Sequence, residues 1–135
     1  MILVQCVNSK RDTAAPAKDL YDSTYFDVMR RYAEATQDNW RILSAKHGLI
    51  HPETEIEPYD EFGLSNEQAA SIATTLATAG INHVEVIAGK KYTNPLTPEL
   101  EEHGIDVLEL CRGMEIGNRI SRLQTLSREK ENCTL

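Results

Sequence analysis

Apolar and polar positions follow two patterns along the chain. Short continuous apolar runs, typical of strands buried on both faces, occur at residues 2–7, 40–44, 83–88 and 106–110. Between and after these runs, apolar side chains recur at helical spacing. Alternating strands and helices predict a parallel sheet, because parallel strands are joined by right-handed helical crossovers.

The helical segments carry end signals in the sequence. In chain order these are a cap near Ser23, a capping box at Ser65 and Gln68 with a stop at Gly80, an opening at Thr97-Pro98 with an end at Gly104, and a start near Glu115. We therefore expect one three-layer α/β/α domain over residues 1–127, with a four-stranded parallel sheet in the order 2-1-3-4. The polar tail, residues 128–135, is expected to fray.

Length and composition narrow the class of protein. A chain of 135 residues fits one domain with a real core. No apolar stretch approaches the ~20 residues of a membrane span and no signal peptide is recognisable, so we expect a cytoplasmic protein without a membrane partner. Cys6 and Cys111 lie in apolar runs and Cys133 lies near a polar end, which predicts reduced thiols that serve packing.

The net charge of -7 argues at first against a nucleic-acid partner. Most of the excess comes from one segment, because residues 51–67 hold six acids and no Lys or Arg. The rest of the chain is close to neutral. The overall charge therefore leaves a local basic surface possible.

Each predicted strand is followed by cationic side chains. They are Lys10 and Arg11, Lys46, Lys90 and Lys91, and Arg112, which make six of the 14 Lys and Arg residues. Because the carboxyl ends of parallel strands share one edge, we expect these side chains to form a rim suited to phosphate groups. The alternative is that exposed loops simply favour lysine.

The segment from Arg41 to Asp60 has the highest concentration of side chains that could take part in catalysis or ligand binding. A strand-like run ends in a loop with Gly and Pro that carries a lysine, two histidines, a tyrosine and several carboxylates. Sites of α/β proteins are commonly built at strand ends in this way. A metal at His47, His51, Glu53 and Glu55 is an alternative, but these loop residues lack the i, i+4 spacing of helical ligands, and we expect neither a metal nor another cofactor.

Several motifs resemble known families. Arg41-Ile42-Leu43-Ser44, then Gly48-Leu49-Ile50, Pro52, Ile56 and Pro58-Tyr59, resemble the central signature of the YaaA-like peroxide-stress proteins. Asn8-Ser9-Lys10, Ala17 to Ser23 with Phe26, Ala88 to Tyr92 with Leu96, and Gly113 to Gly117 resemble a shorter, largely uncharacterised prokaryotic and viral family related to them. These matches run from Cys6 to about Leu123.

The resemblance implies a uracil-DNA-glycosylase-like fold and a DNA or nucleotide-like partner. The chain lacks the Gly-Gln-Asp-Pro-Tyr and His-Pro-Ser-Pro loops of true uracil-DNA glycosylases. Cleavage of an N-glycosidic bond needs a carboxylate near the sugar and a donor for the departing base. The residues expected to be catalytic are Asp60, with Glu57 as an alternative, Lys46, His47, and Asp19, which matches the family's Asp-Leu-Tyr setting.

Other side chains are expected to bind the ligand. Tyr59 or Tyr21 would stack on a flipped base, and Gly117 would let the amides of the last helix approach a phosphate. The full set of expected binding residues is Asn8, Ser9, Lys10, Tyr21, Ser44, Gly48, Tyr59, Lys90, Tyr92, Arg112 and Gly117. Alternatively, Tyr59 is a packing residue, Asp19 an ordinary turn acid and Lys46 a phosphate clamp.

Three functional hypotheses remain open. The first is a small DNA glycosylase that hydrolyses the N-glycosidic bond of a modified or damaged base. The second is a non-catalytic binder of DNA structures, and the third is an enzyme that acts on free nucleosides or nucleotides. The first two predict affinity for the phosphate backbone. The sequence does not indicate the oligomeric state.

Overall fold

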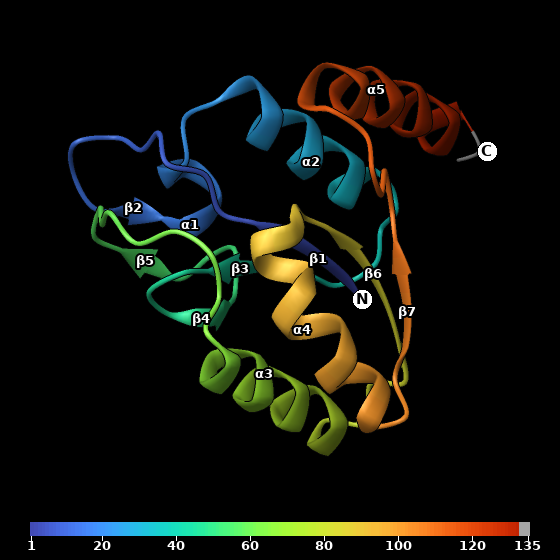
Figure 1. Cartoon of the computed structure of the whole chain (residues 1–135). Helices are drawn as coiled ribbons and strands as arrows, with labels where there is room; N and C mark the ends of the chain where they lie inside the picture. The colour runs from blue at the N-terminus through green and yellow to red at the C-terminus, as the bar shows by residue number, and fades with distance from the viewer. Residues whose placement is uncertain (133–135) are drawn as a thin grey trace.

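The computed structural model describes residues 1–132. Cys133, expected to be a reduced thiol, lies outside the described residues. The elements follow in the order β1 (Ile2–Gln5), β2 (Ala15–Pro16), α1 (Ala17–Leu20), α2 (Thr24–Ala35), β3 (Trp40–Ser44), β4 (Gly48–Ile50), β5 (Glu55–Ile56), α3 (Asn66–Thr78), β6 (His83–Ile87), α4 (Lys90–Glu102), β7 (Asp106–Glu109) and α5 (Ile116–Asn132) (Figure 1).

The main sheet has five strands in the order β4-β3-β1-β6-β7. The four apolar runs of the sequence form its parallel part, in which β1 pairs with β3 on one side and β6 on the other, and β6 pairs with β7. The inner strands β1, β3 and β6 are mostly buried because helices cover both faces of a parallel sheet, whereas the edge strand β7 is exposed or only partly buried. The fold is mixed α/β, as the sequence predicted, but the sheet contains a strand that was not expected.

The additional strand β4 pairs antiparallel with β3, so the expectation of a purely parallel, four-stranded sheet is wrong. Ser44 pairs with Gly48, and only three residues join the two strands. Ser44 Oγ accepts hydrogen bonds from the amides of Lys46 (3.3 Å) and His47 (3.0 Å), and Gly48 has a φ of 72°. Glycine adopts this left-handed conformation without strain, which allows the chain to turn back.

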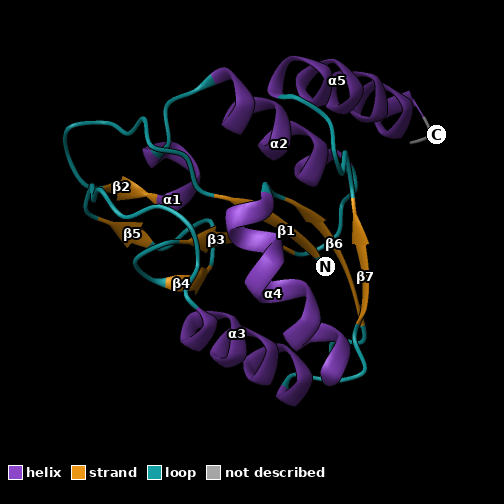
Figure 2. Cartoon of the chain, viewed as in Figure 1, coloured by secondary structure: helices purple, strands orange, loops and turns teal. Residues whose placement is uncertain are grey.

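Figures 1 and 2 show the sheet between two pairs of helices, α2 with α5 and α3 with α4. The predicted caps of two of these helices are confirmed. Ser23 Oγ accepts from the amide of Phe26, and Ser65 and Gln68 form a reciprocal capping box. These caps satisfy amides that have no partner within their own helix.

Helix α4 begins at Lys90, so the predicted start at Thr97-Pro98 is wrong. Pro95 and Pro98 lie inside the helix. Proline has no N–H to bond the carbonyl of the fourth residue before it, but the amide of Leu64 donates to the Lys91 carbonyl at 3.1 Å in place of Pro95. The tertiary contact thus makes the internal proline tolerable.

Helix α5 continues to Asn132, so the segment from Arg128 to Asn132 is helical instead of the frayed tail that was expected. One contact at this end is the paired bond from Arg31 of α2 to Glu131 at 2.8 and 3.1 Å. No helix within residues 1–132 is both long and apolar enough to span a membrane.

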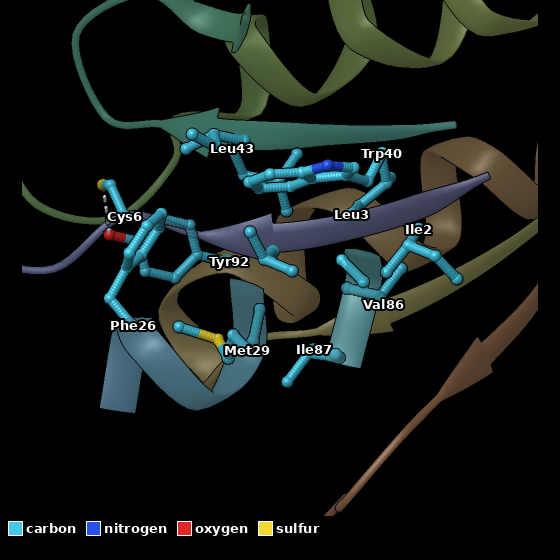
Figure 3. Close-up of a cluster of buried hydrophobic side chains, with 14 of the residues drawn as sticks. Ile2, Leu3, Cys6, Phe26, Met29, Trp40, Leu43, Val86, Ile87 and Tyr92 are labelled. Atoms are coloured by element: carbon cyan, nitrogen blue, oxygen red, sulfur yellow. Dashed lines mark hydrogen bonds between the residues drawn. The ribbon is translucent and has the colours of Figure 1, made fainter. Parts of the chain in front are cut away.

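The core lies against both faces of the sheet. Figure 3 shows Leu3, Phe26, Leu43 and Tyr92 among its buried side chains, each 0% exposed. Cys6 and Cys111 are buried free thiols, as the apolar runs around them predicted. This packing holds the carboxyl ends of the strands in fixed positions.

Candidate functional site

The carboxyl ends of β3, β1, β6 and β7 lie at the same edge of the sheet because these strands are parallel. The chain goes from β1 to β3 on one side and later adds β6 on the other side of β1. The order therefore reverses between β1 and β6. In open α/β sheets the crevice outside such a reversal is the usual place for a ligand.

A cavity of about 640 Å³ lies at this position, and we call it the crevice. Asn8 and Ser9 line it from the loop after β1, Gly89 from the end of β6, and Glu115 from the segment before α5. Of the four large apolar side chains that are exposed within residues 1–132, three also line it: Phe62, Met114 and Ile116. The crevice thus combines an apolar wall with polar groups.

Gln5 fixes the floor of the crevice. Its Oε1 accepts from the Gly89 amide at 2.7 Å, and its Nε2 donates to the Cys6 carbonyl at 3.1 Å. The side chain is only 6% exposed, so these bonds are shielded from water. Gln5 therefore ties the ends of β1 and β6 together where the order of the sheet reverses.

Phe62 is held over the crevice by the turn that follows it. Gly63 has a φ of 87°, a conformation that glycine adopts without strain. The Phe62 ring meets the Tyr92 ring edge to face, with the centroids 5.3 Å apart, and Lys91 Nζ lies 5.7 Å from the Phe62 centroid. Phe62 remains 44% exposed, so part of its surface is open to a ligand.

A second feature, the tyrosine cluster, consists of Tyr21, Tyr59 and Ser44. The Ser44 hydroxyl donates to Tyr59 Oη at 2.8 Å, and the hydroxyls of Tyr59 and Tyr21 lie 2.6 Å apart. Next to it, the Cys6 thiol lies 3.1 Å from the Tyr92 hydroxyl (Figure 3). The sequence predicted all three tyrosines and Ser44 as site residues, and the fold brings them together.

Burial makes these phenols hard to ionise. It raises the pKa of Tyr21 to about 12, and it raises the pKa of Tyr59 and Tyr92 well above the usual value. Near neutral pH they are therefore hydrogen-bonding hydroxyls and not bases. Tyr59 is 7% and Tyr21 is 3% exposed, so neither ring offers an open face for the base stacking expected of it.

Lys10 covers the tyrosine cluster. Its Nζ lies 4.5 Å from the Tyr59 centroid and donates to the Asn8 carbonyl at 3.2 Å. Desolvation lowers the pKa of Lys10, while the charges of nearby acids, including Asp60 and Glu61, oppose that shift. The structure thus places the expected binding residue Lys10 near the expected catalytic residue Asp60, which is exposed.

Two other expected catalytic residues, Lys46 and His47, lie in the turn between β3 and β4 and are exposed. The edge of the His47 ring meets Tyr59, with the centroids 5.6 Å apart. Gly48 begins β4 beside them. His47 therefore borders the tyrosine cluster, whereas within the described residues Lys46 reaches the cluster only through its backbone amide, which donates to Ser44 Oγ.

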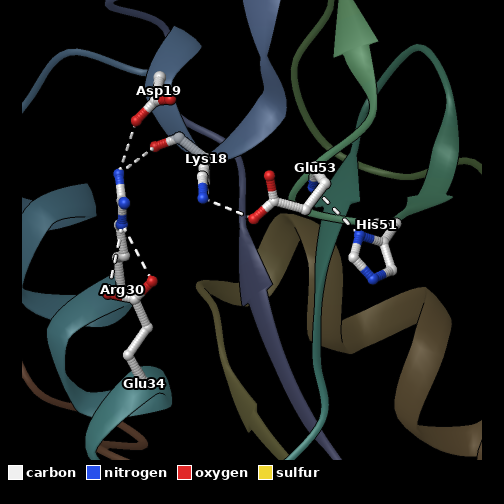
Figure 4. A network of polar contacts seen from close by, with 6 residues as sticks. All are labelled: Lys18, Asp19, Arg30, Glu34, His51 and Glu53. Carbon is white, nitrogen blue, oxygen red and sulfur yellow. Dashed lines mark hydrogen bonds and ion pairs between the residues drawn. The ribbon is translucent and has the colours of Figure 1, made fainter.

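Asp19 belongs to a different network, shown in Figure 4. It accepts from Arg30 Nη1 at 2.8 Å, and the same nitrogen donates to the Lys18 carbonyl at 3.0 Å. These contacts join α1 to α2, which supports the ordinary structural role considered for Asp19. In residues 1–132 no three His, Cys, Asp or Glu side chains are grouped to hold a metal, and His51 Nδ1 instead accepts from the Glu53 amide at 3.0 Å.

A second cavity of about 630 Å³, the polar cavity, lies beside the crevice. It is lined by the expected binding residues Lys90 and Arg112 and by Arg119. Gly117 is the second residue of α5 and is exposed. Arg119 lines both cavities and was missed, although the sequence places it three residues after Ile116 on the same helical stripe.

The fold and these cavities define a mixed α/β protein with a candidate ligand site at the carboxyl edge of a mostly parallel sheet. Residues 1–125 match the family described as "Family of unknown function (DUF6884)", and the chain belongs to that family. It is similar to the "Uncharacterized protein YfjM" of Bacillus subtilis (strain 168), with 30% identity over 122 residues that cover 84% of this chain and 81% of that protein. No solved structure matches the chain significantly. The YaaA-like and glycosylase-like relations stay predictions.

Proposed function

We propose that the protein is a nucleic-acid-acting enzyme that hydrolyses the N-glycosidic bond of a modified or damaged base and takes that base into the crevice. The observation that carries the proposal is that three large apolar side chains, exposed in the described part of the chain, line one cavity: Phe62, Met114 and Ile116. Exposed apolar groups gathered in this way commonly mark a binding site.

The crevice has the properties that base recognition requires. An extruded base needs an aromatic or apolar surface for its face and polar groups for its edge. Phe62 supplies the first, and Asn8 and Ser9, which line the same cavity, supply the second. Phe62 thus replaces Tyr59 and Tyr21 as the stacking residue of the proposal.

The proposed hydrolysis adds water to the sugar carbon while the base leaves and gains a proton. A carboxylate stabilises the developing positive charge on the sugar. Asp60 remains the first candidate because it lies near Lys10, a cation that can donate to the departing base or contact a phosphate. Glu115 is a second candidate because it lines the crevice itself.

A free nucleotide is the second candidate substrate. The observation that favours it is the acidic segment of residues 51–67, which includes Asp60 close to Lys10. Acidic groups at the mouth of a site repel a long phosphate backbone more than a single nucleotide.

The experiment is to incubate the protein with DNA that carries a panel of modified bases, with unmodified DNA, and with the matching free nucleotides. Released base and abasic sites are then measured. Replacing the catalytic carboxylate by its amide should lower the rate by a factor on the order of 100 without weakening substrate binding. Asp60→Asn and Glu115→Gln test the two candidates, and Glu67→Gln, an exposed acid of α3, is the control.

The outcomes separate the hypotheses. Release of base from DNA supports the glycosylase, and release from free nucleotides alone supports the second candidate. If the parent protein binds DNA but releases no base from any substrate, the non-catalytic DNA-binding hypothesis replaces both.

A further inference from the structure

Arg119 of α5 carries a buried charge that no carboxylate neutralises within residues 1–132. The side chain is only 8% exposed. Its Nε donates to the Met114 carbonyl at 2.8 Å, and its Nη1 donates to the Ala88 carbonyl at 3.2 Å and to Tyr25 Oη at 3.4 Å. All three acceptors are neutral. In the same part of the chain Nη2 has no hydrogen-bond acceptor, and because no buried side-chain nitrogen or oxygen there lacks a partner, Nη2 is the atom of this guanidinium that solvent or a ligand can reach.

This arrangement is unusual because a buried charge is costly unless an opposite charge accompanies it. Arginine cannot escape the cost by losing its proton. By contrast, two arginines that are more exposed than Arg119 do have carboxylate partners: Arg30 pairs with Asp19, and Arg31 pairs with Glu131. The buried guanidinium of Arg119 therefore lacks the negatively charged partner that Arg30 and Arg31 have, and an anionic ligand can supply that negative charge.

The position of Arg119 indicates which ligand group it would meet. Arg119 and Met114 line both the crevice and the polar cavity, so the two cavities adjoin at these residues. On the far side, two more cations line the polar cavity: Lys90, the first residue of α4, and Arg112, from the segment after β7. Glu101 and Glu109 also line the polar cavity, so its three cations outnumber its carboxylates by one. The Glu109 carboxylate accepts from the Thr97 hydroxyl at 3.2 Å.

We propose that Arg119 binds the phosphate of a nucleotide, with the base in the crevice and the phosphate in the polar cavity beside Lys90 and Arg112. A guanidinium pairs with phosphate through short, charge-assisted hydrogen bonds. The 17-residue helix α5 begins at this wall, and the amides of Ile116 and Gly117 add partial positive charge. The placement of a base in the crevice rests on the proposed function, whereas the binding of an anion by Arg119 does not depend on it.

The test compares two variants of α5. Arg119→Met removes the buried charge and keeps an unbranched side chain, and Arg122→Met removes an exposed charge three residues away as the matched control. Binding of inorganic phosphate, a nucleoside and the corresponding nucleoside monophosphate is measured by calorimetry at constant ionic strength. A phosphorylated oligonucleotide in a fourth arm distinguishes nucleic acid from free nucleotide.

The monophosphate should bind the parent and Arg122→Met more tightly than the nucleoside does. Arg119→Met should weaken monophosphate binding roughly tenfold to a hundredfold, the range expected for lost hydrogen bonds to a charged group, and should weaken nucleoside binding far less. If Arg119→Met fails to fold, judged by circular dichroism, the exposed pair Lys90→Ala and Arg112→Ala should weaken phosphate binding several-fold instead. Unchanged phosphate affinity in the folded variants would overturn the inference.

Failure of the inference and failure of the proposed function give different results. If the nucleoside binds but the phosphate adds no affinity through Arg119, the base site in the crevice is supported and the phosphate site is refuted. If phosphate binds through Arg119 but no nucleoside, nucleotide or oligonucleotide gains affinity from its base, the phosphate site is supported as an anion site and the base site is refuted.

Discussion

The Tyr59 hydroxyl is the centre of the tyrosine cluster, so its removal should lower the free energy of unfolding. Tyr59→Phe removes a single oxygen that accepts from Ser44 at 2.8 Å and bonds the Tyr21 hydroxyl at 2.6 Å. Both partners are buried, with Ser44 0% and Tyr21 3% exposed, so water cannot easily replace the lost bond. A buried polar group without a partner costs about 1–3 kcal/mol, and two such groups predict a loss of about 2–6 kcal/mol.

The assay is urea unfolding followed by circular dichroism, with the free energy of unfolding taken by linear extrapolation. The midpoint should fall while the slope stays constant, because the exposed surface hardly changes. Tyr32→Phe is the control, since its hydroxyl reaches Glu85 only at 3.4 Å. We expect the control to lose less than about 1 kcal/mol. Equal stability of parent and Tyr59→Phe would refute the proposed energetic role of the cluster.

Burial raises the pKa of all five tyrosines, that of Tyr21 and of Tyr32 to about 12. Because the folded protein favours the protonated phenols, their contribution to the free energy of unfolding is fully present below pH ~10 and should be lost as the pH rises towards 12. Tyrosinate absorbance that appears at pH ~10 in the folded protein would contradict this prediction. Phe62→Ala should weaken nucleotide binding by about 1–3 kcal/mol in a calorimetric titration, whereas Leu108→Ala, an equally exposed side chain of β7 outside the crevice, should have no effect. Ser65→Ala should remove the capping box of α3 and lower the free energy of urea unfolding by about 1 kcal/mol, and an unchanged midpoint would show that this cap does not stabilise the fold.

The parallel strands could be predicted from the sequence because each is an uninterrupted apolar run. Strand β4 could not, since its three residues are only partly buried and its pairing depends on the Ser44 turn and the positive φ of Gly48. The start of α4 was missed for a similar reason. Pro98 is a local signal for a helix start, but the Leu64 bond to the Lys91 carbonyl, which permits a helix through Pro95, is a tertiary contact.

Part of the lining of the two cavities was expected from the sequence. Asn8 and Ser9, expected from a motif, line the crevice. Parallel strands place Lys90 and Arg112 at one edge, and both line the polar cavity. Arg119 and Phe62 were not predicted, because a charge within an apolar helical stripe and an aromatic residue in an acidic loop gain meaning only from the cavities they line. Asp19 matched a motif, but its geometry places it with Arg30.

The most direct test of the account is a nuclear magnetic resonance titration of the protein with a nucleoside monophosphate, following the backbone amide signals. If the crevice and the polar cavity bind the ligand, the largest shifts should occur at Asn8, Gly89 and Ile116, with smaller changes at Arg112. Amides remote from these cavities, such as those of Glu34 and Thr78, should not respond. Shifts confined to other surfaces, or no shifts at saturating nucleotide, would contradict the assignment of this edge as the ligand site.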